Sequence, residues 1–244
     1  MALLKLAVFD MAGTTVRDLK EVETCFADTA RQVGLDVSDE EIQAAQGWTK
    51  RVVFEKYWER QIGSRNEAWQ KEVNASYILF CHNLEQHYLT QGAQPTEGAM
   101  EVLSFLREKG VRTALATGFY RKVTDIILDR LGWLEGLDEH HQNQGASPID
   151  LSLCTEDVKE GKPAPDMILK AMEVFGVTDL SEVLMIGDTP ADIESGKRAG
   201  CLSLGVANGS HRREQLEACQ PDAVLADMHE LIPYLQGRGT DFPA

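Results

Sequence analysis

Short apolar runs alternate along most of the chain with longer stretches in which apolar residues recur every three or four positions. Runs of the first kind are typical of strands buried in a parallel sheet, and the second spacing is typical of helices with one packed face. This alternation predicts an α/β fold with a doubly wound parallel sheet. The predicted strands are residues 3–10, 111–117, 151–154, 183–188, 202–206 and 223–225. Helical patterns between them are 98–109, 121–131, 165–175 and 190–199.

One interval departs from this alternation. Residues 16–91 contain no strand-like run, which predicts an all-helical cap inserted after the first strand. The predicted domains are therefore a core of residues 1–15 and 92–244 and a cap of residues 16–91. Because the insert follows the strand that ends at Asp10, we expect it to act as a lid over the end of that strand. Its helical stretches are 22–33, 39–45, 50–61 and 65–91.

Composition and charge narrow the classes of partner. The chain has 244 residues and a formal net charge of −15, which argues against a nucleic acid or an anionic membrane as partner. No apolar run approaches the roughly 18 residues that a membrane span needs. The first residues lack the basic region and cleavage site of a signal peptide, and the five cysteines form no CxxC pair. We expect a cytoplasmic protein with reduced thiols that binds a small molecule.

Polar side chains gather where the predicted strands end. The carboxyl ends of parallel strands share one edge of a sheet, which is where open α/β folds bind their ligands. Each residue singly has a structural explanation, as a helix cap, a strand end or a surface lysine. Together they supply a nucleophile, a hydroxyl and amide for phosphate, a cation and acidic metal ligands. The residues are Asp10 with Thr14, Thr117 with Gly118, Lys162, and Asp188 with Asp192.

This order of residues resembles the haloacid dehalogenase-like (HAD) hydrolase superfamily, and the resemblance runs from Asp10 to Asp192. It implies a Rossmann-like core in which Asp10 attacks phosphorus and forms an aspartyl-phosphate. Thr117 and Lys162 would hold the phosphoryl oxygens. Mg²⁺ suits a site with oxygen ligands and phosphoryl charge. The implied magnesium ligands are Asp10, the carbonyl of Ala12 and Asp188, with Asp192 bound directly or in support. Substrate contacts are expected at Ala12, Thr14, Gly47 and Gly118.

Ala12 restricts the reaction. Most phosphomonoesterases of this superfamily carry an aspartate at this position, two residues after the nucleophile. That aspartate protonates the leaving alkoxide and later activates water, and such acid–base help contributes roughly 10²–10⁴ in rate. Alanine indicates a leaving group that needs no acid, such as a halide, a phosphoryl donor or a stabilised carbanion, or else a proton donor elsewhere. A slow phosphatase is the alternative.

Lys50 offers a route to the stabilised carbanion. A lysine can condense with an aldehyde, and the iminium accepts electrons when a carbon–phosphorus bond breaks. Residues 10–16 match the DxAGTTV start of the phosphonoacetaldehyde hydrolase (phosphonatase) family, and Gly47 with Lys50 matches its cap motif GxxK. The chain looks like that family, whose cap lysine forms a Schiff base. Alternatively, Lys50 binds substrate phosphate, as cations at this turn do in superfamily phosphatases.

The sequence also departs from the phosphonatase pattern. Val53 stands where that family has a histidine, Gln46 where it has methionine, and Phe119 where it has tyrosine. Lys162 replaces an arginine, and Lys20 lies near the position of a cysteine. Because these groups lie near the scissile bond, a related small phosphonate is as well supported as phosphonoacetaldehyde itself.

The sequence therefore predicts a Mg²⁺-dependent, phosphonatase-like HAD hydrolase. A phosphomonoesterase for small organic phosphates and a non-catalytic HAD-fold binding protein are the alternatives. A carbon–halogen hydrolase also suits Ala12, but Asp188 with Asp192 speaks against it, because displacement at carbon needs no Mg²⁺. The resemblance also implies a homodimer, since related phosphonatases pair through their caps.

Overall fold

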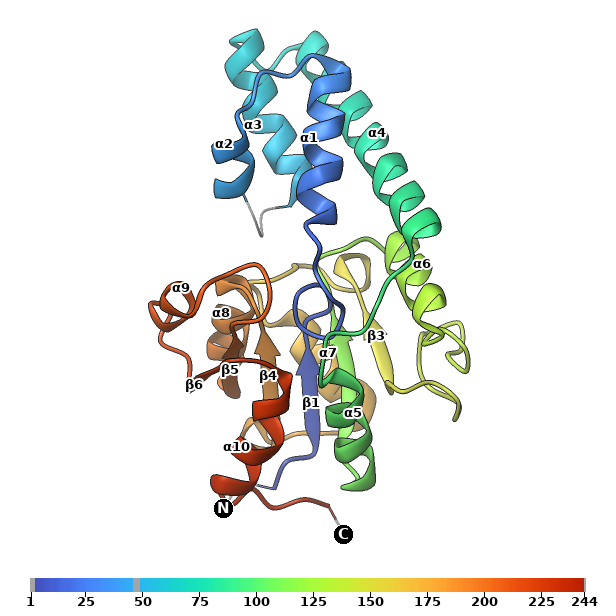
Figure 1. Ribbon diagram of the computed structural model, residues 1–244, viewed down its shortest axis with the longest axis vertical. Helices are drawn as coiled ribbons and strands as arrows, with labels where there is room; N and C mark the ends of the chain where they lie inside the picture. Colours follow the sequence, from blue (N-terminus) through green and yellow to red (C-terminus); the bar gives the residue numbers. More distant parts are fainter. Residues whose placement is uncertain (1–2, 46–48, 244) are drawn as a thin grey trace. The chain divides into compact units, whose positions relative to one another are not determined.

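The computed structural model describes residues 3–45 and 49–243. The chain divides into two compact units, one formed by Met1–Asp18 with Ala93–Ala244 and the other by Leu19–Gly92. The first is called the core unit below and the second the helical unit (Figure 1). None of the described helices combines the length and apolarity that crossing a membrane requires.

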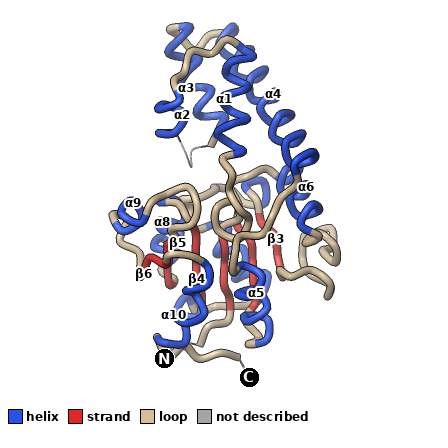
Figure 2. Tube along the Cα trace, in the orientation of Figure 1, coloured by secondary structure: helices blue, strands red, loops and turns tan. Residues whose placement is uncertain are grey.

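The core unit contains a six-stranded sheet in which neighbouring strands are parallel. Its strands are β1 (Leu6–Phe9), β2 (Arg112–Ala116), β3 (Leu151–Leu153), β4 (Val183–Gly187), β5 (Leu202–Val206) and β6 (Ala223–Leu225). Their order is β3-β2-β1-β4-β5-β6, seen as the central strands of Figure 2. Strands β2 and β3 are added on one side of β1, and β4, β5 and β6 on the other, so the order in which the chain adds strands reverses between β1 and β4. Ligands of open α/β sheets bind outside the carboxyl ends of the strands at such a point.

Helices cover both faces of this sheet, which confirms the predicted α/β fold. They are α5 (Ala99–Glu108), α6 (Arg121–Leu131), α7 (Asp166–Phe175), α8 (Pro190–Ala199), α9 (Arg213–Glu217) and α10 (Leu231–Gly237). In Figure 1, α5 and α10 lie in front of the sheet and α7 behind it. Short 3₁₀ helices occur at Thr155–Asp157, Leu180–Glu182 and Met228–Glu230.

The central strand β1 shows why its sequence is uniformly apolar. Successive side chains of a strand point to opposite faces of the sheet. Leu6 and Val8 pack in one cluster with Met167 and Ala171 of α7, while Ala7 and Phe9 are buried on the other face. A strand covered on both faces has no polar positions, so it appears as a continuous apolar run.

The helical unit, in the part that the structure describes, contains helices and no strand. Its helices are α1 (Glu21–Val33), α2 (Asp39–Ala44), α3 (Lys50–Ile62) and α4 (Glu67–Gln91). Three aromatic rings form its centre: Phe26 of α1 stacks on Phe54 of α3 with 4.6 Å between ring centroids, and Phe80 of α4 meets both edge-on. The indole of Trp58 donates a hydrogen bond of 2.8 Å to Ser76 and joins α3 to α4.

Candidate active site

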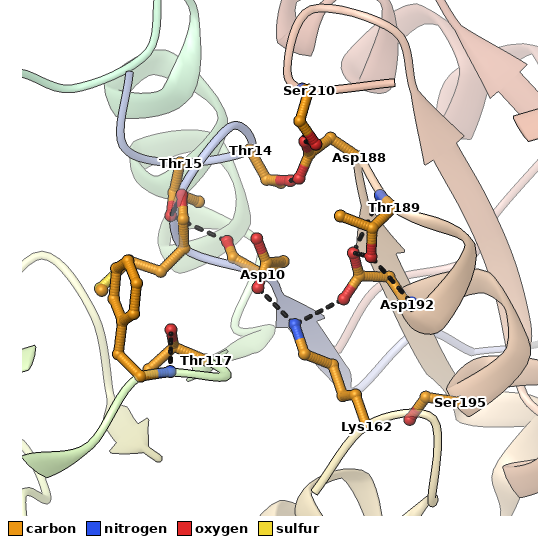
Figure 3. Close-up of polar contacts among 12 residues, drawn as sticks. Asp10, Thr14, Thr15, Thr117, Lys162, Asp188, Thr189, Asp192, Ser195 and Ser210 are labelled. Carbon is orange, nitrogen blue, oxygen red and sulfur yellow. Dashed lines mark hydrogen bonds and ion pairs between the residues drawn. The ribbon is translucent and has the colours of Figure 1, made fainter. Parts of the chain in front are cut away.

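Three carboxylates meet at the carboxyl ends of β1 and β4. Asp10 directly follows β1, and Asp188 directly follows β4, so the pairing of these strands brings the two residues together. With Asp192 of α8 they form a buried group, in which one oxygen atom of each carboxylate lies within 4.8 Å of the others. Figure 3 shows this arrangement. It lies at the point of the sheet where a ligand is expected.

The turn after β1 holds Asp10 in place. The Thr15 hydroxyl donates a hydrogen bond of 2.9 Å to the Asp10 carbonyl. The amides of Thr15 and Val16 both donate to the carbonyl of Met11, and the Gly13 amide donates back to the Val16 carbonyl at 2.7 Å. The turn is thereby closed by its own hydrogen bonds, which leaves the Asp10 carboxylate for other partners.

Lys162 places a cation between two of the carboxylates. Its ammonium forms ion pairs with Asp10 and, at 2.5 Å, with Asp192 (Figure 3). Burial alone would lower the pKa of Lys162, but the charges of the two aspartates raise it above its ordinary value. Lys162 is therefore a permanent cation beside Asp10. The loop that carries it is tied to α8, because the buried Ser195 hydroxyl donates to the Ala164 carbonyl at 2.9 Å.

Asp192 has donors on both of its oxygens. One oxygen accepts from the amide and the hydroxyl of Thr189, at 3.0 and 2.6 Å, within the capping box that starts α8. The other faces Lys162. A Cβ at Gly187 would lie 2.2 Å from the carboxyl carbon of Asp192, so this close packing requires glycine. The arrangement suits support of the metal site and orientation of Lys162 better than direct metal ligation.

Asp188 is oriented by two loops. The amide and hydroxyl of Ser210 each donate to one of its oxygens at 2.7 Å, and the Thr14 hydroxyl donates to the other at 3.2 Å. A Cβ at Gly13 or at Gly209 would lie within 2.4 Å of an Asp188 oxygen. The sequence assigned Thr14 to the substrate; the structure places its hydroxyl on Asp188.

The electrostatics of the group favour a divalent cation. Burial raises the pKa of Asp10 well above its ordinary value, although Lys162 opposes this effect. Burial, and then the charge of Asp192, raises the pKa of Asp188 to about 6. Three buried carboxylates with one ammonium leave an excess of negative charge, and a cation relieves it. The donors are carboxylate oxygens, which hard cations such as Mg²⁺ prefer.

Thr117 follows β2, next to β1 in the sheet, and is 2% exposed. Its hydroxyl oxygen accepts a hydrogen bond of 3.2 Å from the Phe119 amide, which leaves its own proton to donate. Gly118 is exposed, with no other atom within 4 Å of the position a Cβ would take. A hydroxyl and an exposed backbone at this edge suit the expected contact with phosphoryl oxygens, which stays a prediction.

Lys50 begins α3 in the helical unit. Its amine donates a hydrogen bond of 3.1 Å to the Ala45 carbonyl, after the end of α2. Burial lowers the pKa of Lys50, and the charge of Glu23 opposes that shift. Gly47, expected to contact the substrate, lies outside the described residues. Val53, where the phosphonatase pattern has histidine, is 1% exposed and belongs to the core of this unit.

Sequence reasoning missed the residues that orient the carboxylates. Ser210 lies in the loop after β5, so the rule that located Asp188, a polar residue following a predicted strand, would have located it too. Thr189 begins the sequence TPAD, which has the spacing of a capping box. The hydrogen bond from Ser195 had no sequence signal, because it joins α8 to a loop that the strand pattern does not place.

A family model described as haloacid dehalogenase-like hydrolase matches residues 4–200. The chain belongs to this family. A phosphonoacetaldehyde hydrolase of Bacillus cereus (strain AH187) is 29% identical over 96% of this chain and 93% of the relative. The solved structures that share the fold include a phosphonoacetaldehyde hydrolase-like protein from Oleispira antarctica (TM-score 0.77, 20% identity, 96% and 92% of the two chains) and a putative phosphoglycolate phosphatase from Lactobacillus delbrueckii (TM-score 0.75, 21% identity, 96% and 99%).

These comparisons confirm that the protein is a HAD-fold hydrolase and that its sequence is similar to phosphonoacetaldehyde hydrolases. The match from residue 4 to residue 200 includes every residue of the acidic group and Lys50.

Proposed function

We propose that this protein is a Mg²⁺-dependent hydrolase that cleaves the carbon–phosphorus bond of phosphonoacetaldehyde or a related small phosphonate. The observation that carries the proposal is a half-buried lysine of lowered pKa, Lys50, in a HAD hydrolase that has Ala12 where phosphomonoesterases have an acid. A lysine of lowered pKa is the kind of amine that condenses with a carbonyl group. The similarity to phosphonoacetaldehyde hydrolase supports the same chemistry.

Asp10 is the nucleophile in the proposed reaction. Its carboxylate attacks phosphorus, while Lys162 and the Thr117 hydroxyl bind phosphoryl oxygens and keep the group in line. Asp10, the Ala12 carbonyl and Asp188 would hold Mg²⁺, which supplies positive charge against the phosphoryl oxygens when bound. Asp192 orients Lys162 through the ion pair between them.

Lys50 accepts the electrons in the proposed reaction. Its amine condenses with the substrate aldehyde to an iminium and releases water. When Asp10 bonds to phosphorus, the carbon–phosphorus bond breaks and its electron pair forms an enamine on Lys50. The enamine takes a proton on carbon, and water releases the aldehyde product from Lys50 and then phosphate from Asp10. No alkoxide leaves, so no acid is needed at Ala12.

Trapping with borohydride tests this function. We expect phosphate and acetaldehyde to be released from phosphonoacetaldehyde with Mg²⁺, and borohydride to reduce a substrate adduct onto Lys50, located by peptide mass mapping. Lys50→Arg keeps the positive charge but cannot form an imine, so it should lose both the adduct and the turnover. Lys56→Arg, a change of the same kind in the same helix, serves as the control and should keep both. A missing adduct in the wild type, together with unchanged turnover in Lys50→Arg, would contradict the proposal.

A phosphomonoesterase remains the second candidate, because the acidic group, Lys162 and Thr117 all belong to the core unit and supply the groups that binding a phosphoryl group requires. In that case Lys50 binds substrate phosphate. Such an enzyme would hydrolyse alkyl phosphates, and Lys50→Arg would retain most of the activity. Among phosphate esters, a phosphonatase should hydrolyse p-nitrophenyl phosphate but no alkyl phosphate, since the p-nitrophenolate leaving group needs little acid.

A further inference from the structure

Two stacked rings set the register of α1 and α3. The rings of Phe26 and Phe54 are 4.6 Å apart and inclined by 26°, and both side chains are buried. Figure 1 shows that α1 and α3 begin at the same end of the helical unit and run in the same direction. Residues one turn before each ring therefore lie at the same level of the unit.

Glu23 and Lys50 are those residues. Glu23 precedes Phe26 by three positions, and Lys50 precedes Phe54 by four. Side chains three or four residues apart lie on the same face of a helix. Both residues therefore project from the faces that the ring stack brings together, and both lie in the first turns of their helices.

The surroundings of the two side chains agree with this placement. One carboxylate oxygen of Glu23 is buried, and the charge of Glu23 acts on the Lys50 amine. The Ala45 carbonyl after α2 accepts a hydrogen bond from that amine, and Glu23 of α1 is the charged residue that raises its pKa. A carboxylate and an amine that both lose part of their hydration and interact electrostatically are a pair between which a proton can move.

We propose that Glu23 is the proton-transfer partner of Lys50, and that it both removes the proton from the amine and returns it during imine formation. This inference rests on the proposed function. The Glu23 carboxylate takes a proton from the Lys50 ammonium, and the free amine bonds to the aldehyde carbon. The amine then passes a proton to the former carbonyl oxygen, which gives a carbinolamine. Glu23 finally returns its proton to the hydroxyl, which leaves as water, and the iminium remains.

The proposal predicts two effects of opposite sign in Glu23→Gln. Loss of the negative charge should lower the pKa of Lys50 further, so the amine should react with an arylating reagent at lower pH than in the wild type. Loss of the proton carrier should nevertheless slow imine formation, by about 10²-fold, the lower end of the usual range for acid–base catalysis. A group that acted only as a counter-ion would change both rates in the same direction, because more free amine would make both reactions faster.

The experiment measures both reactions in the full-length protein. Arylation of Lys50 by 2,4-dinitrofluorobenzene is followed against pH, and borohydride trapping with phosphonoacetaldehyde is timed at neutral pH. Asp28→Asn is the matched control: it removes a charge from the same helix, where Asp28 pairs with Arg31 at 2.8 Å. The control should leave both reactions unchanged. Thermal melts show that each variant is folded.

Each outcome decides between the proposals. An arylation midpoint at lower pH with slower trapping in Glu23→Gln supports proton transfer. Trapping at or above the wild-type rate overturns it, while the proposed function stands. Absence of any wild-type adduct overturns the Schiff-base function and this inference together. If Glu23→Gln does not fold, Glu23→Asp takes its place: its shorter carboxylate should slow trapping, and trapping at the wild-type rate would overturn the inference.

Discussion

The two units each bury a lysine near carboxylates, and the two lysines differ in charge behaviour. In the core unit, Lys162 is paired with Asp10 and Asp192, which raise its pKa. In the helical unit, burial lowers the pKa of Lys50 against the pull of Glu23. Both side chains lose hydration, so the number and closeness of their carboxylate partners decide the direction of the shift.

This difference separates two chemical roles for one residue type. A lysine of raised pKa stays protonated and suits the binding of phosphoryl oxygens, whereas one of lowered pKa supplies a free amine. The first role needs counter-charges at ion-pair distance, and the second needs burial with fewer of them. The proposed reaction uses both roles, with the charge in the core unit and the nucleophilic amine in the helical unit.

The largest effect is expected from Asp10→Asn. It removes the proposed nucleophile, so turnover should fall on the order of 10⁵-fold, as when other enzymes lose a nucleophile. It also removes one of the two carboxylate charges that pair with Lys162. The pKa of the Lys162 amine should therefore fall, as that of Lys50 does, and the amine should react with 2,4-dinitrofluorobenzene at lower pH. Phosphate release and the pH dependence of arylation measure the two effects. Unchanged phosphate release would exclude Asp10 as the nucleophile.

Lys162→Met should have the next largest effect. Removing one partner of a buried ion pair costs about 3–5 kcal/mol of stability, and protonation of Asp10, whose pKa is already raised, offsets part of that cost. Turnover should fall roughly 10²–10³-fold through loss of charge stabilisation. Denaturant unfolding and steady-state kinetics measure these changes. The control is Lys170→Met: its ion pair with Glu173 is solvent-exposed, and its loss should cost less than about 1 kcal/mol.

Mg²⁺ and pH should act on the core unit in opposite directions. Without metal, the folded-state pKa of Asp188 is about 6, above its ordinary value, so the folded protein binds more protons than the unfolded chain between about pH 4 and 6. Stability of the metal-free protein should therefore rise as the pH falls from 7.5 to 5, by about 1.4 kcal/mol. Mg²⁺ should raise the melting temperature at pH 7.5 and have little effect at pH 5.

Thermal melts with Mg²⁺ or with a chelator, at both pH values, check this prediction. Asp188→Asn serves as the reference, because it removes the titrating group and should flatten the dependence on pH. A stabilisation by Mg²⁺ of equal size at pH 5 and pH 7.5 would count against metal binding at Asp188.

The smallest effect is expected from Ser210→Ala. The substitution removes one of the two donors from a single oxygen of Asp188 and leaves the backbone amide in place. Mg²⁺ should bind about 10-fold more weakly, the lower end of the range for groups that orient metal ligands. Calorimetric titration measures the affinity. Ser104→Ala, a change at an exposed helix position, is the control, and equal affinities in the two variants would contradict the role given to Ser210.

The sequence contained the information for the elements themselves. Short continuous apolar runs predicted the strands of the core unit, because both faces of its sheet are buried, and period-3.6 patterns predicted the helices of the helical unit, because one face of each helix is packed. Strand-end positions likewise identified Asp10, Thr117 and Asp188 as site candidates. The hydrogen bond from the Thr14 hydroxyl to Asp188, 174 residues away in sequence, had no local signal, and the expected contact of Thr14 with the substrate stays a prediction.

What the sequence by itself determined is the kind of fold and the chemical groups at the strand ends, because both follow from local periodicity and residue type. Tertiary structure decided which groups meet: Lys162 with Asp10 across 152 residues, Ser210 with Asp188, and Phe26 with Phe54 in the ring stack. It also decided the opposite pKa shifts of the two lysines. A pKa depends on burial and on charges a few ångströms away, and in a folded chain those neighbours come from distant parts of the sequence.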